Sequence, residues 1–265
     1  MKTILLVIFF TLNLSASLIR TELVSVDYGK NTATVVLQKG DVGVSGFLVH
    51  AIAPNHSSIL KNVTVIAYDK ETKIATLKMS DFNALVNNAL PTGNWKAVPG
   101  DKVELAFGYT RSLLIAPSEE IYHQITKSVQ TQWVHIDIFA TILSYRGHPT
   151  PLKQDFEAMN IASSVGLLFV YLDQKLYTID IKSFMILNIN EAPLKQDSEQ
   201  LPFYSRVEHI EANWWGEGSS QLEAYEPHYY ELLVENNPKN EKLYEIIKNG
   251  DEKYHYLLEN FELGK

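Results

Sequence analysis

The sequence predicts an α+β protein: a β-rich N-terminal sheet or small barrel, followed by a mixed α/β sandwich and a helical C-terminal segment. Three observations lead to this fold class. Of the 265 residues, 46% are apolar and 20% are charged, which is typical of a globular protein with a buried core. Short runs rich in Val, Ile, Thr and Tyr fill the first part of the chain. Helical spacing of apolar residues becomes frequent only after residue 112.

The first region, residues 18–110, is predicted to be a β-rich domain of mostly antiparallel strands. Turn residues separate the predicted strands at 32–37, 46–52, 63–68, 74–79 and 102–107. Asp69-Lys70-Glu71-Thr72 indicates a hairpin connection, and Val98-Pro99-Gly100-Asp101 indicates a turn before the last strand. A short helix is also predicted over residues 81–87, with Asp81 as its N-cap.

The second region, residues 111–207, is predicted to mix helices with strands. Pro117-Ser118-Glu119-Glu120 has the capping chemistry of a helix that continues towards Lys127. The run Gly147-His148-Pro149-Thr150-Pro151 stops a second helix, and Asp173-Gln174 indicates a tight hairpin turn. The other predicted elements are strands at 113–116, 165–172, 175–181 and 184–189, and helices at 136–144 and 152–159.

The last region, residues 208–265, is predicted to be acidic and mainly helical. Residues 207–265 hold thirteen acidic residues and five lysines, so this stretch accounts for the whole formal net charge of -8. Pro227 suits a first helical position, Asn236-Asn237-Pro238 breaks the helix, and Asn249-Gly250 ends a second one. The apolar stripes of these helices have two interpretations: they dock on the body, or they form a surface for a partner.

The first seventeen residues have the pattern of a signal peptide. Met1-Lys2 is a short positive region, residues 3–14 are apolar, and Ser15-Ala16-Ser17 supplies the small residues before a cut after Ser17. A membrane span needs about 20 apolar residues, so a short membrane anchor is the less favoured alternative. We therefore expect an exported protein that has no transmembrane segment after cleavage.

Cysteine usage and charge narrow the class of protein further. The chain has no cysteine, which excludes disulfides, thiolate metal sites, iron–sulfur clusters and a cysteine nucleophile. Export without cysteine is more typical of a bacterial envelope than of a secreted eukaryotic domain. The negative net charge disfavours nucleic-acid binding, because phosphates need a basic surface. We expect a location in the periplasm or on the outer surface of a Gram-negative bacterium.

The sequence holds no recognisable catalytic motif. Phosphate-binding glycine loops, His-Glu-x-x-His and Gly-x-Ser-x-Gly are absent, and the three-residue spacing of Gly40, Gly43 and Gly46 suits turns and a strand entry. His135 and Asp137 offer two metal ligands without a third. We therefore expect no enzyme activity, no cofactor and no metal.

Two adjacent pairs of residues allow more than one interpretation. Glu119 and Glu120 are a candidate carboxylate pair, but neighbours on a helix diverge by about 100°, and acids in a first turn favour the helix dipole. Trp214-Trp215 suits either stacking on a sugar or protein partner, or burial as an anchor for the C-terminal segment.

An ordered set of short blocks resembles the plasminogen-binding proteins of Helicobacter, Campylobacter and their relatives, over about residues 23–207. The blocks are Ser45-Gly46-Phe47-Leu48-Val49, Leu90-Pro91-Thr92, Pro99-Gly100-Asp101-Lys102-Val103, Leu113-Leu114-Ile115-Ala116-Pro117, Gly147-His148-Pro149-Thr150-Pro151-Leu152, Ser164-Val165-Gly166-Leu167-Leu168-Phe169-Val170, Lys182-Ser183-Phe184 and Pro202-Phe203-Tyr204-Ser205-Arg206-Val207. The resemblance implies an envelope protein that captures host plasminogen, with a role in virulence.

The same resemblance implies a role for the last lysine. In that family a free C-terminal lysine is implicated in docking to the lysine-binding kringles of plasminogen, and Lys265 matches that position. A terminal lysine presents its ammonium and its α-carboxylate together. The alternative function is a structural component of a periplasmic assembly, such as the flagellar motor, whose partner is another envelope protein.

Overall fold

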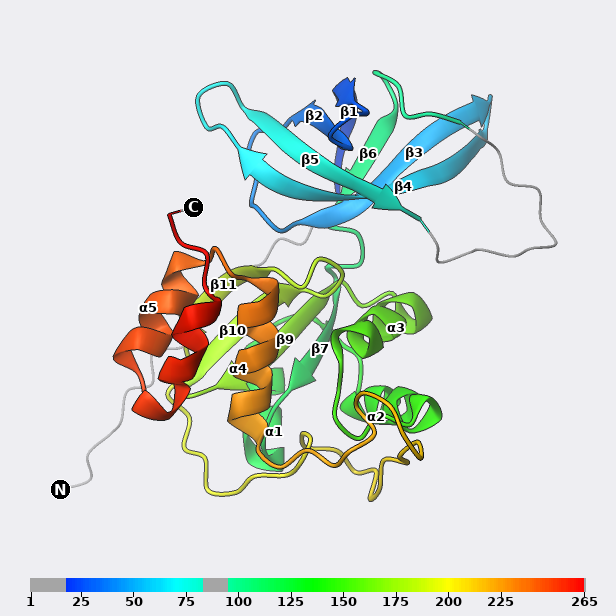
Figure 1. Cartoon of the computed structure of the whole chain (residues 1–265). Helices are drawn as coiled ribbons and strands as arrows, with labels where there is room; N and C mark the ends of the chain where they lie inside the picture. The colour runs from blue at the N-terminus through cyan, green and yellow to red at the C-terminus, as the bar shows by residue number, and fades with distance from the viewer. Residues whose placement is uncertain (1–17, 83–94, 265) are drawn as a thin grey trace.

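The first part of the chain forms a closed antiparallel barrel of six strands. The computed structural model describes residues 18–82 and 95–264 (Figure 1). The strands run in the order β1-β2-β5-β4-β3-β6, and pairing of β1 with β6 closes the barrel. Their bounds are β1 (Ile19–Asp27), β2 (Thr32–Val36), β3 (Ser45–Ala53), β4 (His56–Tyr68), β5 (Ile74–Asp81) and β6 (Lys102–Leu105).

Aliphatic side chains fill the barrel because inward and outward residues alternate along each strand. In β5, for example, Ala75, Leu77 and Met79 are buried, while the residues between them are more exposed. The strand β1 was not predicted, because Leu23 is its only buried residue and its apolar alternation is weak. Gly46 lets β3 approach β6, since a Cβ at this position would lie 2.0 Å from the carbonyl oxygen of Glu104.

The second sheet is mixed and has five strands in the order β11-β10-β9-β7-β8. Its strands are β7 (Arg111–Ile115), β8 (Gln132–Trp133), β9 (Leu167–Leu172), β10 (Lys175–Asp180) and β11 (Ile186–Glu191). Strand β7 runs parallel to β8 and β9, whereas β9, β10 and β11 pair antiparallel. All six residues of β9 are buried, which shows that both faces of the sheet are covered.

Helices provide this cover. They are α1 (Glu119–Ser128), α2 (Ile136–Arg146), α3 (Lys153–Ser163), α4 (Tyr225–Asn236), α5 (Glu241–Asn249) and the 3₁₀ helix η1 (Glu252–Asn260). Figure 1 shows α4 in front of β9 and β10, with α5 and η1 beside it. None of the helices within residues 18–82 and 95–264 is long and apolar enough to cross a membrane.

The C-terminal helices belong to the core of this second region. Tyr225 of α4 is buried, and its hydroxyl donates to the carbonyl oxygens of Tyr171 at 2.9 Å and Ile115 at 3.2 Å. Leu243 and Leu257 are buried as well. Of the two interpretations of the apolar stripes, docking on the body is therefore confirmed. The prediction of an α+β protein with a β-rich barrel first and helices last is confirmed too.

Two local predictions were wrong. Asp81 does not cap a helix but ends strand β5, where it lies opposite Lys61 and binds its ammonium at 2.6 Å; the remainder of the predicted helix lies largely outside the described residues. Pro227 is the third residue of α4 and not the first, because the helix begins at Tyr225. Proline is tolerated there, since the first four N–H groups of a helix have no partner within it.

Candidate functional site

A buried carboxylate joins the barrel to the second sheet. Asp180, at the end of β10, is fully buried. Its Oδ2 accepts hydrogen bonds from the backbone N–H of Ser45 in β3 at 2.8 Å and from the Tyr109 hydroxyl at 2.7 Å. Its Oδ1 accepts from the backbone N–H groups of Lys182 at 3.0 Å and Ser183 at 2.8 Å. These four bonds compensate the loss of water around the charge, and they fix Lys182 beside the barrel.

Close backbone packing supports the same junction. Gly108 has a φ of 77°, and a Cβ there would lie 2.6 Å from the carbonyl oxygen of Ser164. A Cβ on Gly166 would lie 2.4 Å from the carbonyl carbon of Gly108. The connection out of the barrel therefore touches the segment that follows α3 directly, backbone against backbone. Burial and the neighbouring Asp180 raise the pKa of Tyr109 well above its usual value, so its hydroxyl remains a donor.

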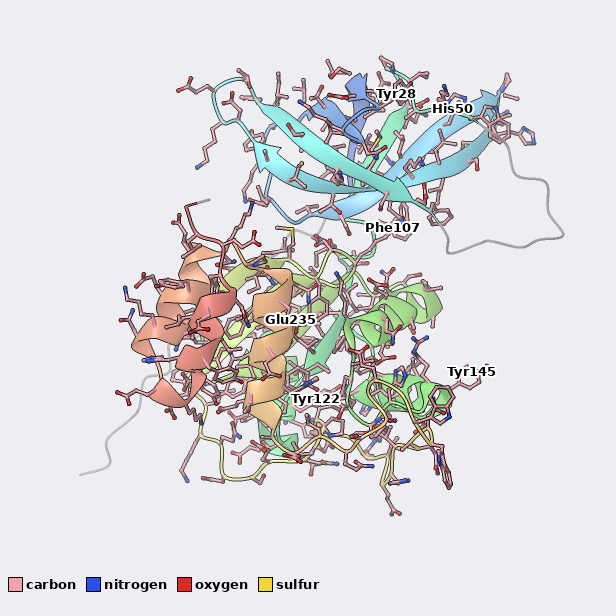
Figure 2. All side chains as sticks on the ribbon, in the orientation of Figure 1. Tyr28, His50, Phe107, Tyr122, Tyr145 and Glu235 are labelled. Atoms are coloured by element: carbon pink, nitrogen blue, oxygen red, sulfur yellow. The ribbon has the colours of Figure 1, made fainter. Side chains whose placement is uncertain are left out.

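A cleft of about 670 Å³ lies beside this junction, between the barrel and α3. Its lining includes Phe47, Asn62, Asp81 and Phe82 from the barrel side, and Phe107, Glu157, Asn160 and Lys182 from beyond β6. Figure 2 places Phe107 between the barrel and the second region. Clefts between domains that combine apolar walls with a few polar groups are common ligand sites.

Lys182 is the cation of this cleft. Its ammonium donates to Oδ1 of Asn62 at 2.5 Å and lies 3.9 Å from the centroid of the Phe47 ring. It forms no ion pair with a carboxylate in the part of the chain that the structure describes. Burial lowers the pKa of Lys182 to about 8, although the charges of Asp180 and Glu157 act in the opposite direction.

The structure gives His135 and Asp137 local structural roles. His135 is the N-cap of α2, and its Nδ1 accepts from the Asp137 backbone N–H at 3.2 Å. The Asp137 carboxylate binds the Arg206 guanidinium, with a distance of 2.7 Å between Nε and Oδ2. Burial acts to raise the pKa of Asp137, but hydrogen bonds from Arg206 and Ser205 outweigh it, and the pKa is lowered. No group of three or more His, Asp or Glu residues that could hold a metal occurs within the described ranges.

The carboxylate pair and the glycines also have local explanations. Glu119 and Glu120 lie in the first turn of α1, which Ser118 caps by accepting from the Ile121 N–H at 3.4 Å. Gly43 has a φ of 100° and lies in the turn before β3, while Gly40 packs against the ring of Tyr68.

Trp214 and Trp215 are not buried anchors. Their side chains are 97% and 82% exposed. Asn213 fixes their loop to α2: its N–H donates to the carbonyl oxygen of Gly147 at 2.9 Å, and its side-chain amide donates to that of Arg146 at 2.7 Å. Tyr145, 93% exposed, projects outward from the same end of α2 (Figure 2). The loop thus presents its two indoles to solvent, and the interpretation as a buried anchor is wrong.

Lys265, the residue predicted to bind a partner, lies outside the described residues. The segment leading to it is held to the body, because the Glu262 N–H donates to the Pro238 carbonyl oxygen at 2.8 Å and the Phe261 ring packs edge-on against Tyr244 at 5.3 Å. Beyond Glu262, Gly264 is exposed, with open space around its Cα.

Two buried acids with clear roles were missed in the sequence. One is Asp180 at the junction; the other is Asp155 in α3, which binds Arg146 at 2.5 Å and His148 at 2.9 Å and accepts from the Leu152 N–H at 2.7 Å. A signal existed for Asp180, since it is the only acid in an otherwise apolar strand pattern. Asp155 gave no comparable signal, because an acid in the first turn of a helix is ordinary.

Comparison with known proteins assigns the chain to a family. The family model described as "Plasminogen-binding protein pgbA N-terminal" matches residues 18–233. This chain belongs to that family. It is 29% identical to plasminogen-binding protein PgbA of Helicobacter pylori strain J99 over 204 residues, which is 76% of this chain and 44% of the relative. It is 30% identical to PgbA of strain 26695 over 227 residues, or 84% of this chain and 49% of the relative.

The chain spans about half the length of the curated relatives it matches. No solved structure matches it. The matched range includes the barrel, the second sheet and most of α4, so the junction at Asp180 and the cleft with Lys182 both lie within the family region.

Proposed function

We propose that this protein is an exported, non-catalytic envelope protein that binds host plasminogen, and that Lys265 is the residue that docks to plasminogen. Membership of a family described as plasminogen-binding is the observation that carries the proposal. The C-terminal segment supports the proposal, because it is bound to the protein at Glu262 and Gly264 is exposed. A terminal lysine offers an ammonium and a carboxylate to one receptor.

The test is plasminogen binding by the purified protein from residue 18 to residue 265, with and without a free lysine analogue as competitor. We expect saturable binding that the analogue abolishes. Deleting Lys265 removes most of this binding. Adding one glycine after Lys265 should also remove most of the binding, because the lysine ammonium remains but the α-carboxylate now belongs to the added residue.

The matched control is Lys127→Ala, which removes an exposed lysine from α1. We expect this variant to bind as the unaltered protein does. If the deletion and the intact protein bind equally, Lys265 is not the site. If neither binds plasminogen, the proposed function fails, and a structural role in a periplasmic assembly is the function to test next.

A further inference from the structure

The cleft between the barrel and α3 contains an ammonium that no carboxylate of the described residues binds directly. Lys182 has three N–H donors, and Asn62 takes one of them. Both oxygens of the nearby Asp180 already accept bonds from four other groups. Half-buried cations are normally paired with an anion, so this ammonium has unused capacity for one.

No side chain outside the described ranges carries a carboxylate. Residues 1–17 and 83–94 contain no Asp or Glu, so neither stretch can supply a side-chain carboxylate. Asp81, on the barrel side of the cleft, is neutralised by Lys61 at 2.6 Å. Glu157 is exposed on α3 and forms no ion pair among the described residues. A carboxylate ligand would therefore meet Lys182 without competition from a bound acid.

Aromatic rings form an apolar wall next to this cation. Phe47 packs edge-on against Phe82 at 5.7 Å and against Phe107 at 5.2 Å between ring centroids. Phe107 is 45% exposed, although it lies at the junction of the two regions (Figure 2). An apolar group bound in the cleft would cover this exposed ring surface, and its burial would contribute to affinity.

We propose that this cleft binds a small ligand in which a carboxylate is joined to an apolar or aromatic group. The carboxylate lies on the Lys182 ammonium, and the apolar group lies against Phe47 and Phe107. Free carboxylic acids and the C-terminal end of a peptide share this chemistry. The site is independent of Lys265 and of plasminogen.

The experiment measures binding of N-acetylphenylalanine by calorimetry, with N-acetylphenylalaninamide as the ligand that lacks the carboxylate. We expect saturable binding of the acid and about tenfold weaker binding of the amide, which lacks the charge-assisted hydrogen bond; tenfold corresponds to about 1.4 kcal/mol. Acetyl-Ala-Ala-Phe distinguishes the two sources, because tighter binding of the tripeptide identifies a peptide terminus. Failure of both acids to bind overturns the proposal.

Three variants locate the site. Lys182→Met keeps the aliphatic stem and should weaken binding of the acid about tenfold, whereas Lys182→Arg keeps the cation and should bind within a few-fold of the unaltered protein. Lys127→Met, an exposed lysine on α1, is the matched control and should bind normally. Equal binding by Lys182→Met and the unaltered protein overturns the proposal, as does equal weakening by Lys127→Met.

A pH profile on the unaltered protein keeps the test decisive if Lys182→Met does not fold. The ligand carboxylate is ionised above pH 6, while the pKa of Lys182 is about 8. The other charged groups around it are Asp180, Glu157 and the Asp81–Lys61 pair. Affinity should be constant from pH 6 to pH 7 and should fall as the pH rises through 8. Affinity that does not change up to pH 9 contradicts the proposal.

Discussion

The barrel and the second region bury different kinds of side chain. The largest fully buried side chains of the barrel are leucines, such as Leu48, Leu77 and Leu105, and most of its interior is Ala, Val and Leu. The second region buries ten fully enclosed aromatic side chains: Tyr171, Tyr177, Tyr225, Tyr229, Tyr230, Phe139, Phe156, Phe169, Phe184 and Phe203. A barrel of six strands encloses a narrow interior that aliphatic groups fill, whereas an open sheet with helices on its faces leaves room for rings.

This difference shows how the C-terminal helices are held. Tyr225 and Tyr229 of α4 are fully buried, and the hydroxyl of Tyr229 donates to the Pro202 carbonyl oxygen at 3.0 Å. Burial raises the pKa of both residues well above the usual value of tyrosine. Each ring thus combines a large apolar area with a satisfied hydroxyl, and the acidic segment is anchored through its tyrosines.

The largest effect is expected from truncating an aromatic side chain in the second region. Phe156 stacks on Phe139 at 4.6 Å between centroids and is fully buried. Phe156→Ala should lower the free energy of unfolding by about 3–5 kcal/mol, as measured by chemical denaturation. Tyr145→Ala, at a 93% exposed position, is the control and should change it by less than about 0.5 kcal/mol. Similar losses in both variants would contradict an aromatic core.

A smaller effect is expected at the junction of the two regions. Asp180→Asn keeps the shape of the side chain, but it replaces one accepting oxygen with an NH₂ group, which cannot accept the hydrogen bonds that this oxygen receives. The free energy of unfolding should fall by about 1.5–3 kcal/mol. Because Asp180 links β3 to β10, the denaturation curve should also become less steep as the two regions unfold less cooperatively. The control is Asp41→Asn, at an exposed site. An unchanged denaturation curve for Asp180→Asn would show that other contacts couple the two regions.

The barrel should respond more weakly to truncation than the aromatic core. Val65 in β4 is fully buried, and Val65→Ala should cost about 1.5 kcal/mol, from about 0.8 kcal/mol per buried methylene-sized group. Val36→Ala removes the same atoms from a position that is 48% exposed, and it should cost less than about 0.5 kcal/mol. Thermal and chemical denaturation measure both losses. If Val65→Ala lowers the free energy of unfolding as much as Phe156→Ala does, the two interiors differ in composition but not in their contribution to stability.

The smallest effect is a pH dependence within the second region. Burial lowers the pKa of His228, whose Nε2–H donates to the Pro151 carbonyl oxygen at 2.9 Å. The unfolded chain therefore takes up this proton first, and the stabilising contribution of neutral His228 is lost as the pH falls below about 6.5. Between pH 7.5 and pH 5.5 the free energy of unfolding of the unaltered protein should fall more than that of His228→Gln. Parallel losses in the two proteins would assign the pH dependence to other groups.

Local signals predicted much of the fold. Asp173-Gln174 was predicted as a hairpin turn, and both residues have the positive φ that such a turn requires, at 43° and 57°. The helix starting near Glu119 was predicted because its cap and first-turn acids lie next to each other in sequence. These features depend on neighbouring residues, so one sequence is sufficient to find them.

The cleft was not predictable in this way. The properties of Lys182 depend on Asn62, which is 120 positions away, and on Phe47. As a sequence, Lys182-Ser183-Phe184 is an ordinary turn after a strand. Only closure of the barrel, and its attachment through Asp180, brings a lysine of the second region against the aromatic wall of the first.

The exposed loop that contains Trp214 and Trp215 determines how this protein behaves in spectroscopy. Of four tryptophans, Trp214 and Trp215 are almost wholly in water, and Trp95 is 45% exposed. The emission of the native protein should therefore already be red-shifted, and it should change little on unfolding. Any molecule that covers the loop would shift this emission to the blue. The two indoles thus make a built-in fluorescent reporter for contacts on one defined patch of the surface.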